Sequence, residues 1–149
     1  MTVIVAIRIG EGSRAAAEAA RHLAKLLGAD LRVLYVAKEL EAVPELAAAA
    51  RQSHEEVRAR MIEEIRARCR EEMGDELVAG TRLIVTEGNV AQAVSRVARE
   101  LEAGLIVVGM KGRSALSRFV LGDTTSAVLE NAPCPVVVIP PALFEGRAE

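Results

Sequence analysis

Short apolar runs that alternate with helical segments place the strongest constraint on the fold of this chain. Each run is rich in β-branched residues, is too short for a stable helix and lacks the polar alternation of a half-exposed strand. Such runs are typical of strands that are buried on both faces, as in parallel sheets. The predicted strands cover residues 3–9, 31–36, 82–85, 105–108 and 136–139.

Helical periodicity fills the stretches between these runs. Small and apolar side chains recur at spacings of three and four after Ser13, a candidate N-cap, until Gly28 ends the pattern. The other expected helices cover residues 45–75, 90–101 (capped by Asn89) and 124–131, and a mobile connection covers residues 38–44. Strands that alternate with helices predict an α/β fold, a five-stranded parallel sheet with helices on both faces.

Length, charge and composition exclude several functional classes. The 149 residues suit one domain, for which we expect residues 1–141, followed by a tail over residues 142–149. A net charge of −2 and only three aromatic residues argue against nucleic-acid and membrane binding. The first residues lack the basic segment of a secretory signal, so we expect a cytoplasmic protein. The isolated thiols of Cys69 and Cys134 predict neither a disulfide nor a zinc site.

A glycine-rich segment from Gly109 to Gly122 follows the fourth predicted strand. Glycines let backbone amides approach an anion closely, and a helix that starts after Gly122 adds a favourable dipole. Lys111 and Arg113 add positive charge. The segment predicts a phosphate cradle, with a plain tight turn as the alternative. It is not a P-loop, because no Gly-Lys-Ser/Thr opens a helix after the first strand.

The spacing of these glycines resembles that of a known family. Gly109, Gly112 and Gly122 fit the pattern G-x2-G-x9-G, and VIVAI, LIVVGMKGRSALSRFVLG and NAPCPVVVIP match in the same order along the chain. Over nearly its whole length the sequence is similar to the universal stress protein family. The resemblance implies a Rossmann-like fold of the adenine nucleotide alpha hydrolase-like type, with strand order 3-2-1-4-5. In one branch of the family, ATP lies between the loops after strands one and four.

The resemblance also implies which residues would hold a nucleotide. They lie at the ends of strands one, two and four and at the start of the last helix. These residues are Ile7, Arg8, Val36, Gly109, Met110, Gly112, Arg113, Gly122, Asp123, Thr124 and Thr125. The ligand would be ATP or AMP, with Mg²⁺ in the case of ATP; no cofactor follows from the residues alone.

Three positions depart from the nucleotide-binding pattern. Arg8 stands where the family has an acid, Gly10 replaces a serine, and Asp123 replaces a serine or threonine after the third glycine. A carboxylate at Asp123 repels a nearby phosphate. In one interpretation, Arg8 and Asp123 form an ion pair that occupies the nucleotide site. In a second, Arg8 is solvated and Asp123 only caps a helix; in a third, Arg8 turns toward the phosphate of a nucleotide bound in an altered pose.

The last predicted strand, residues 136–139, would be an unprotected apolar edge of the sheet. The family resemblance implies dimers joined through the fifth strands, and pairing with a twin gives a closed two-fold interface. The alternative is that the C-terminal tail of the same chain covers this edge.

These observations predict a non-enzymatic regulatory or interaction protein, homodimeric, with an altered nucleotide site that is weakened or absent. The alternative is a stress-response protein that binds ATP or AMP through residues 109–125, with slow hydrolysis at most. No catalytic or metal-binding residues are predicted, because neither His22 nor His54 has recognisable triad partners in the sequence.

Overall fold

A computed structural model describes residues 1–9, 13–110 and 122–140 of the chain. Its centre is a five-stranded sheet in the order β3-β2-β1-β4-β5, in which all neighbouring strands run parallel. The strands are β1 (Thr2–Ile7), β2 (Asp30–Val36), β3 (Leu83–Thr86), β4 (Ala103–Gly109) and β5 (Val136–Ile139). The predicted fold class and strand order are therefore confirmed.

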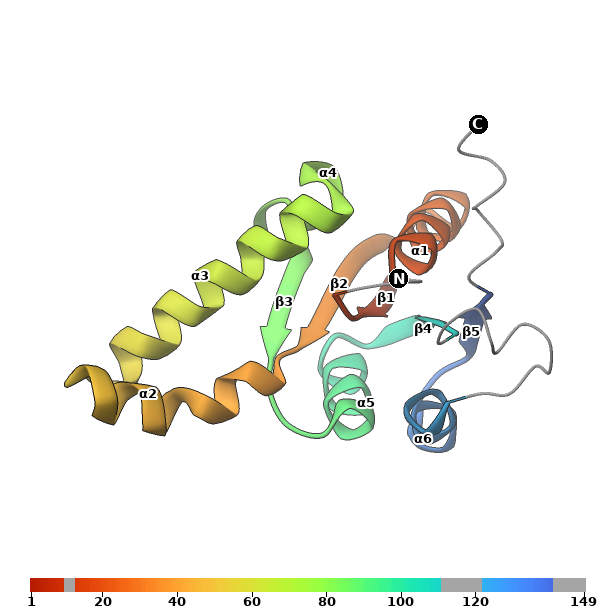
Figure 1. The fold of residues 1–149 in the computed structure, drawn as a ribbon. Helices are drawn as coiled ribbons and strands as arrows, with labels where there is room; N and C mark the ends of the chain where they lie inside the picture. Colours follow the sequence, from red (N-terminus) through yellow and green to blue (C-terminus); the bar gives the residue numbers. More distant parts are fainter. Residues whose placement is uncertain (10–12, 111–121, 141–149) are drawn as a thin grey trace.

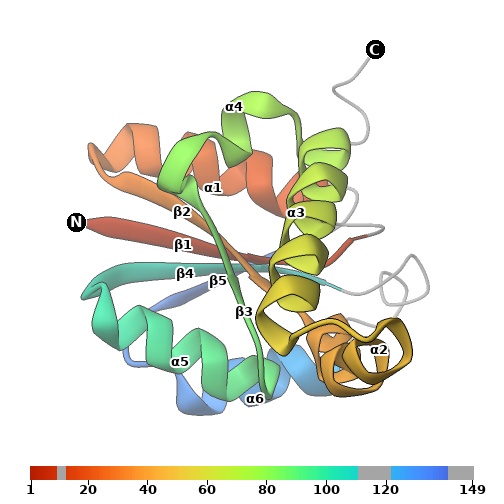
Figure 2. The ribbon, with the colours of Figure 1, turned by 90° about the vertical axis from the view of Figure 1, so that its left-hand side faces the viewer.

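Helices cover both faces of this sheet. Figures 1 and 2 show α1 on one face and α5 and α6 on the other, with α2 and α3 beyond β3. The α-helices are α1 (Ser13–Leu27), α2 (Val43–Ala50), α3 (His54–Met73), α4 (Asp75–Val78), α5 (Val90–Glu100) and α6 (Asp123–Asn131), and the 3-10 helices are η1 (Lys38–Ala42) and η2 (Gly80–Arg82). Within the part of the chain that the structure describes, no helix is long and apolar enough to cross a membrane.

Alternation along the strands divides the core into two layers. Val3 and Val5 of β1 pack on the α1 side, whereas Ile4 packs on the α5 side, and all three side chains are fully buried. The sheet-facing side of α1 consists of alanines that are at most 4% exposed, namely Ala16, Ala17, Ala19, Ala20 and Ala24. Because these side chains are small, the backbone of α1 packs directly over the sheet.

The expectation of one long helix over residues 45–75 is wrong. Helix α2 ends at Ala50, because Arg51 takes a left-handed conformation with φ of 55°. A new helix, α3, then begins after Ser53, whose side chain accepts a hydrogen bond from the Glu56 N–H at 3.1 Å. Residues 38–44, expected to be a mobile connection, form η1 and the first turn of α2.

Smaller differences concern the ends of elements. Strand β1 ends at Ile7 rather than at residue 9, and α6 begins at Asp123 rather than at residue 124. The predicted cap at Asn89 is confirmed, because its side chain accepts a hydrogen bond from the Gln92 N–H at 3.1 Å. The division between a domain and a tail stays a prediction, since residues 141–149 lie outside the described residues.

Candidate functional site

A cavity of about 730 Å³ opens at the carboxyl ends of β1, β2 and β4. This is the edge at which open α/β sheets bind ligands. All the predicted site residues that the structure describes line this cavity, namely Ile7, Arg8, Val36, Gly109, Met110, Gly122, Asp123, Thr124 and Thr125. Gly112 and Arg113, also predicted, lie outside the described residues. Elements far apart in the sequence thus converge on one space.

Hydrogen bonds donated by backbone N–H groups fix the strand ends that form this cavity. The Arg8 N–H donates to the Ser13 hydroxyl at 2.9 Å, which ties the end of β1 to the first turn of α1. Ser13 is the first residue of α1 and is only 5% exposed, so its hydroxyl accepts this hydrogen bond in a buried position. On the other side, the Met110 N–H donates to the Ile139 carbonyl at 3.0 Å and joins the end of β4 to β5.

The start of α6 contributes polar groups to the same cavity. Asp123 and Thr124 are exposed in its first turn, while Thr125 is buried. A helix N-terminus favours negative charge. The Asp123 carboxylate supplies such a charge itself, and the two threonines place hydroxyl-bearing side chains beside it.

The predicted ion pair between Arg8 and Asp123 is not formed. Both side chains are exposed and line the cavity, yet no hydrogen bond or ion pair joins them among the residues that the structure describes. Arg8 follows β1, and Asp123 opens α6. The cavity is therefore not filled by a pairing of these two charges.

The wall of the cavity near η1 holds a polar cluster that sequence reasoning missed. The Tyr35 hydroxyl of β2 donates to Glu39 Oε2 at 2.6 Å, and Arg68 Nη2 of α3 donates to the same oxygen at 2.5 Å. Tyr35 and Glu39 both line the cavity. Their spacing of four residues gave no indication, because it crosses from a strand into a 3-10 helix and Arg68 comes from a distant helix.

This environment fixes the charges of the cluster. Burial alone raises the pKa of Glu39, but hydrogen bonds from Tyr35, from its own backbone and from Arg68 outweigh it and lower the pKa below its usual value. Burial and the neighbouring Glu39 carboxylate raise the pKa of Tyr35. Around neutral pH, Glu39 is therefore an ionised acceptor and Tyr35 a protonated donor.

The two cysteines take no part in this chemistry. Both are free thiols. Burial raises the pKa of Cys69 to about 11 and also raises that of Cys134, so both stay protonated near neutral pH. The described residues contain no group of three or more His, Cys, Asp or Glu side chains that could hold a metal ion.

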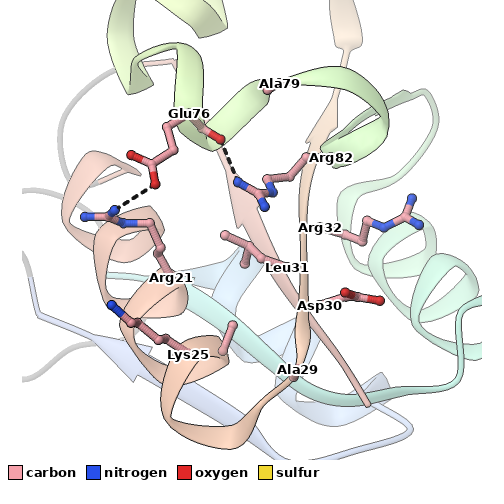
Figure 3. Close-up of a pocket in the computed structure, with 10 residues that line it drawn as sticks. Arg21, Lys25, Ala29, Asp30, Leu31, Arg32, Glu76, Ala79 and Arg82 are labelled. Carbon is pink, nitrogen blue, oxygen red and sulfur yellow. Dashed lines mark hydrogen bonds and ion pairs between the residues drawn. The ribbon is translucent and has the colours of Figure 1, made fainter.

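A second cavity, of about 680 Å³, lies at the opposite, amino end of the sheet. Figure 3 shows Arg21 and Lys25 of α1 on one side of it and Glu76 and Arg82 on the other. Arg21 pairs with Glu18 and Glu76 at 2.9 and 3.2 Å, and Arg82 Nη1 donates to the Glu76 carbonyl at 2.6 Å. Both guanidinium groups are thus engaged within the protein, which makes this cavity the weaker candidate.

Comparison with known proteins identifies the family. Residues 1–140 match the model of the Universal stress protein family. The chain belongs to this family. Among curated relatives, Universal stress protein MJ0531 of Methanocaldococcus jannaschii is 30% identical over 134 residues, which are 87% of this chain and 77% of that protein. The resemblance predicted from the glycine spacing and the apolar strands is confirmed.

Solved structures of universal stress proteins share the fold. Universal stress protein UspA from Lactobacillus plantarum is 26% identical, with a TM-score of 0.63 over 93% of this chain and 97% of that chain. A universal stress protein solved in complex with cAMP is 21% identical, with a TM-score of 0.63 over 95% of this chain and 97% of that chain. The likeness to the second protein concerns the fold.

Proposed function

We propose that this universal stress protein is a homodimeric regulatory protein that binds an adenine nucleotide in the carboxyl-end cavity, in a pose adapted to Arg8 and Asp123. The observation that carries the proposal is the cavity itself. Its volume of about 730 Å³ suits a small organic ligand, and it lies where parallel sheets bind nucleotides. The structure of a family member with cAMP adds support.

The charges of the cavity define the pose. Arg8 and Asp123 line it without pairing to each other, so each is available to a ligand. The guanidinium attracts phosphate oxygens, whereas the carboxylate in the first turn of α6 repels them. We therefore expect the phosphates to lie toward Arg8 and away from the carboxylate of Asp123.

Calorimetric titration with ATP, AMP and cAMP, with and without Mg²⁺, tests this function. Arg8→Gln should weaken binding about tenfold, because it removes a charge-assisted hydrogen bond. Asp123→Asn should tighten binding, because it removes a repulsive charge. Lys25→Gln is the matched control, since it removes one cation from the amino-end cavity and should leave the affinity unchanged.

Thermal unfolding gives a second readout. A nucleotide at 100 times its dissociation constant should stabilise the wild type by about 2.7 kcal/mol. If neither method detects any of the three nucleotides, the cavity is not a nucleotide site. The chain is then a regulatory protein that has lost nucleotide binding, in which Asp123 serves α6 alone.

The proposed dimer forms through β5. In parallel strands the N–H and C=O of one residue point to the same side, and Pro135 and Ile139 point their carbonyls toward β4. Val136 and Val138 therefore direct their backbone groups outward. A second copy, related by a two-fold axis, would satisfy these groups and extend the sheet.

A further inference from the structure

An acidic side chain faces the cavity from η1. Glu39 lines the cavity together with Lys38, and its side chain is 34% exposed. Arg8 lies at the end of the neighbouring strand β1, and Asp123 enters from α6. Among the described residues that line the cavity, Glu39 is the acidic residue contributed by η1.

Side chains from two other elements hold this carboxylate in place. Tyr35 from β2 and Arg68 from α3 both donate to Oε2, and Tyr35 itself is only 7% exposed. A hydrogen bond from the backbone of Glu39 itself adds to these two. A buried hydroxyl and a guanidinium thus fix the orientation of a carboxylate that still reaches the cavity, which is how preorganised acceptors are built.

The charge of Glu39 selects what it can bind. An ionised carboxylate repels phosphate oxygens and accepts hydrogen bonds from neutral O–H and N–H groups. Arg8 and Lys38 have the opposite preference. A nucleotide has an anionic end and a neutral, donor-rich end, and the carboxylate of Glu39 suits the second of these.

We infer that Glu39 is the specificity-determining acceptor for the neutral donors of the bound nucleotide, its sugar hydroxyls or its base amino group. Tyr35 and Arg68 are the positioning residues that aim it. The inference rests on the nucleotide-binding function proposed above and names the side chain that recognises the nucleoside part.

The test is a matrix of affinities measured by calorimetry. Wild type and Glu39→Gln are each titrated with ATP, with 2′,3′-dideoxy-ATP, which lacks the sugar hydroxyls, and with ITP, which lacks the 6-amino group. Glu39→Gln should weaken ATP binding about tenfold to one-hundredfold, as expected for a hydrogen bond to a charged acceptor. The analogue that lacks the recognised donor should lose the same factor in wild type and nothing further in Glu39→Gln.

Two more variants separate recognition from structure. Tyr35→Phe keeps the ring and removes the bond that orients Glu39, so it should weaken ATP binding by a smaller factor. Glu87→Gln is the matched control, because it neutralises an exposed, ion-paired glutamate that does not line the cavity. It should leave ATP binding unchanged, and circular dichroism should show all variants folded.

The inference is overturned if wild type binds ATP and Glu39→Gln binds it equally well, in which case Glu39 only braces α3 against η1. It is also overturned if both analogues lose affinity equally in wild type and Glu39→Gln. These results leave the proposed function standing. A wild type that binds no nucleotide removes the proposed function and this inference together.

Discussion

The two edge strands of the sheet have the same length but differ in the hydrogen bonds that their outward backbone groups make. β3 and β5 are four residues each. Beside β3, the outward carbonyl of Leu83 accepts a hydrogen bond from Arg66 Nη1 of α3 at 3.3 Å. At β5, the outward groups of Val136 and Val138 make no hydrogen bond within the described residues. Helix α3 thus supplies a hydrogen-bond donor to the β3 edge, whereas the described residues supply none to the outward groups of β5.

The origin of this difference lies in the connections. The segment between β2 and β3 contains α2 and the 20-residue α3, which lies beside β3 in Figures 1 and 2. An ion pair between Arg58 and Glu87 at 2.8 Å joins α3 to the residue after β3. The nine-residue α6 before β5 instead packs on a face of the sheet. The long crossover before β3 thus contains a helix that contacts this edge strand.

Proline at the outward position of each edge tests the comparison most strongly. Val138→Pro removes an outward N–H of β5 while preserving the bonds to β4, so it should convert the dimer to a monomer. Val85 is the equivalent position of β3, because Thr86 points its carbonyl toward β2. Val85→Pro should therefore remain dimeric. Sedimentation velocity at several protein concentrations measures both.

A dimer that survives Val138→Pro would show that β5 is not the interface. If the C-terminal tail covers β5 instead, the wild type should be monomeric, and a chain that lacks residues 142–149 should associate. In that case one chain would cover both edges of its own sheet, β3 with α3 and β5 with the C-terminal tail.

Removal of the guanidinium that covers β3 should have a smaller effect. Arg66→Met keeps most of the side-chain length and leaves the Leu83 carbonyl without its donor. The free energy of unfolding should fall by about 1 kcal/mol, the usual contribution of one hydrogen bond. Urea denaturation measures this change. An unchanged stability would mean that solvent serves this edge as well as Arg66 does.

Acid should loosen the helix that protects β3. Arg68 of α3 pairs with Glu39, whose pKa is lower in the folded protein than its usual value of about 4.3. A lowered pKa stabilises the fold at pH values above the pKa that Glu39 has in the unfolded chain. This stability is lost as the pH falls through the pKa that Glu39 has in the folded protein. The stability difference between wild type and Glu39→Gln should therefore be constant above about pH 5.5 and shrink below about pH 4. Denaturation at a series of pH values measures it, and a pH-independent difference would contradict the assignment.

The smallest effect is expected for the tether between α3 and the end of β3. Arg58 and Glu87 are 40% and 46% exposed, and exposed ion pairs contribute at most about 1 kcal/mol. Arg58→Gln should thus change the free energy of unfolding by less than Arg66→Met does. Salt should reduce the difference from wild type further. A larger loss than for Arg66→Met would make this tether the main protection of the edge.

The sequence predicted the sheet and the location of the cavity well, for a local reason. The apolar strands are short-range patterns that predicted the sheet, and the family resemblance implied residues such as Arg8 and Asp123, which line the cavity. The break at Arg51 was missed because the helical periodicity resumes in α3 only three residues after α2 ends. The Tyr35–Glu39–Arg68 cluster was missed because it joins three elements whose packing no local pattern encodes.

The alanine side of α1 has a mechanical consequence. Alanine has no side-chain rotamers, so this part of the core loses no side-chain entropy on folding and cannot adjust by rotamer changes. Any added volume at Ala16 or Ala20, both fully buried, must displace the helix as a rigid body. Ser13 would move with it, and through the bond to the Arg8 N–H so would the end of β1. The size of the side chains between α1 and the sheet thus sets the position of the cavity wall at the end of β1.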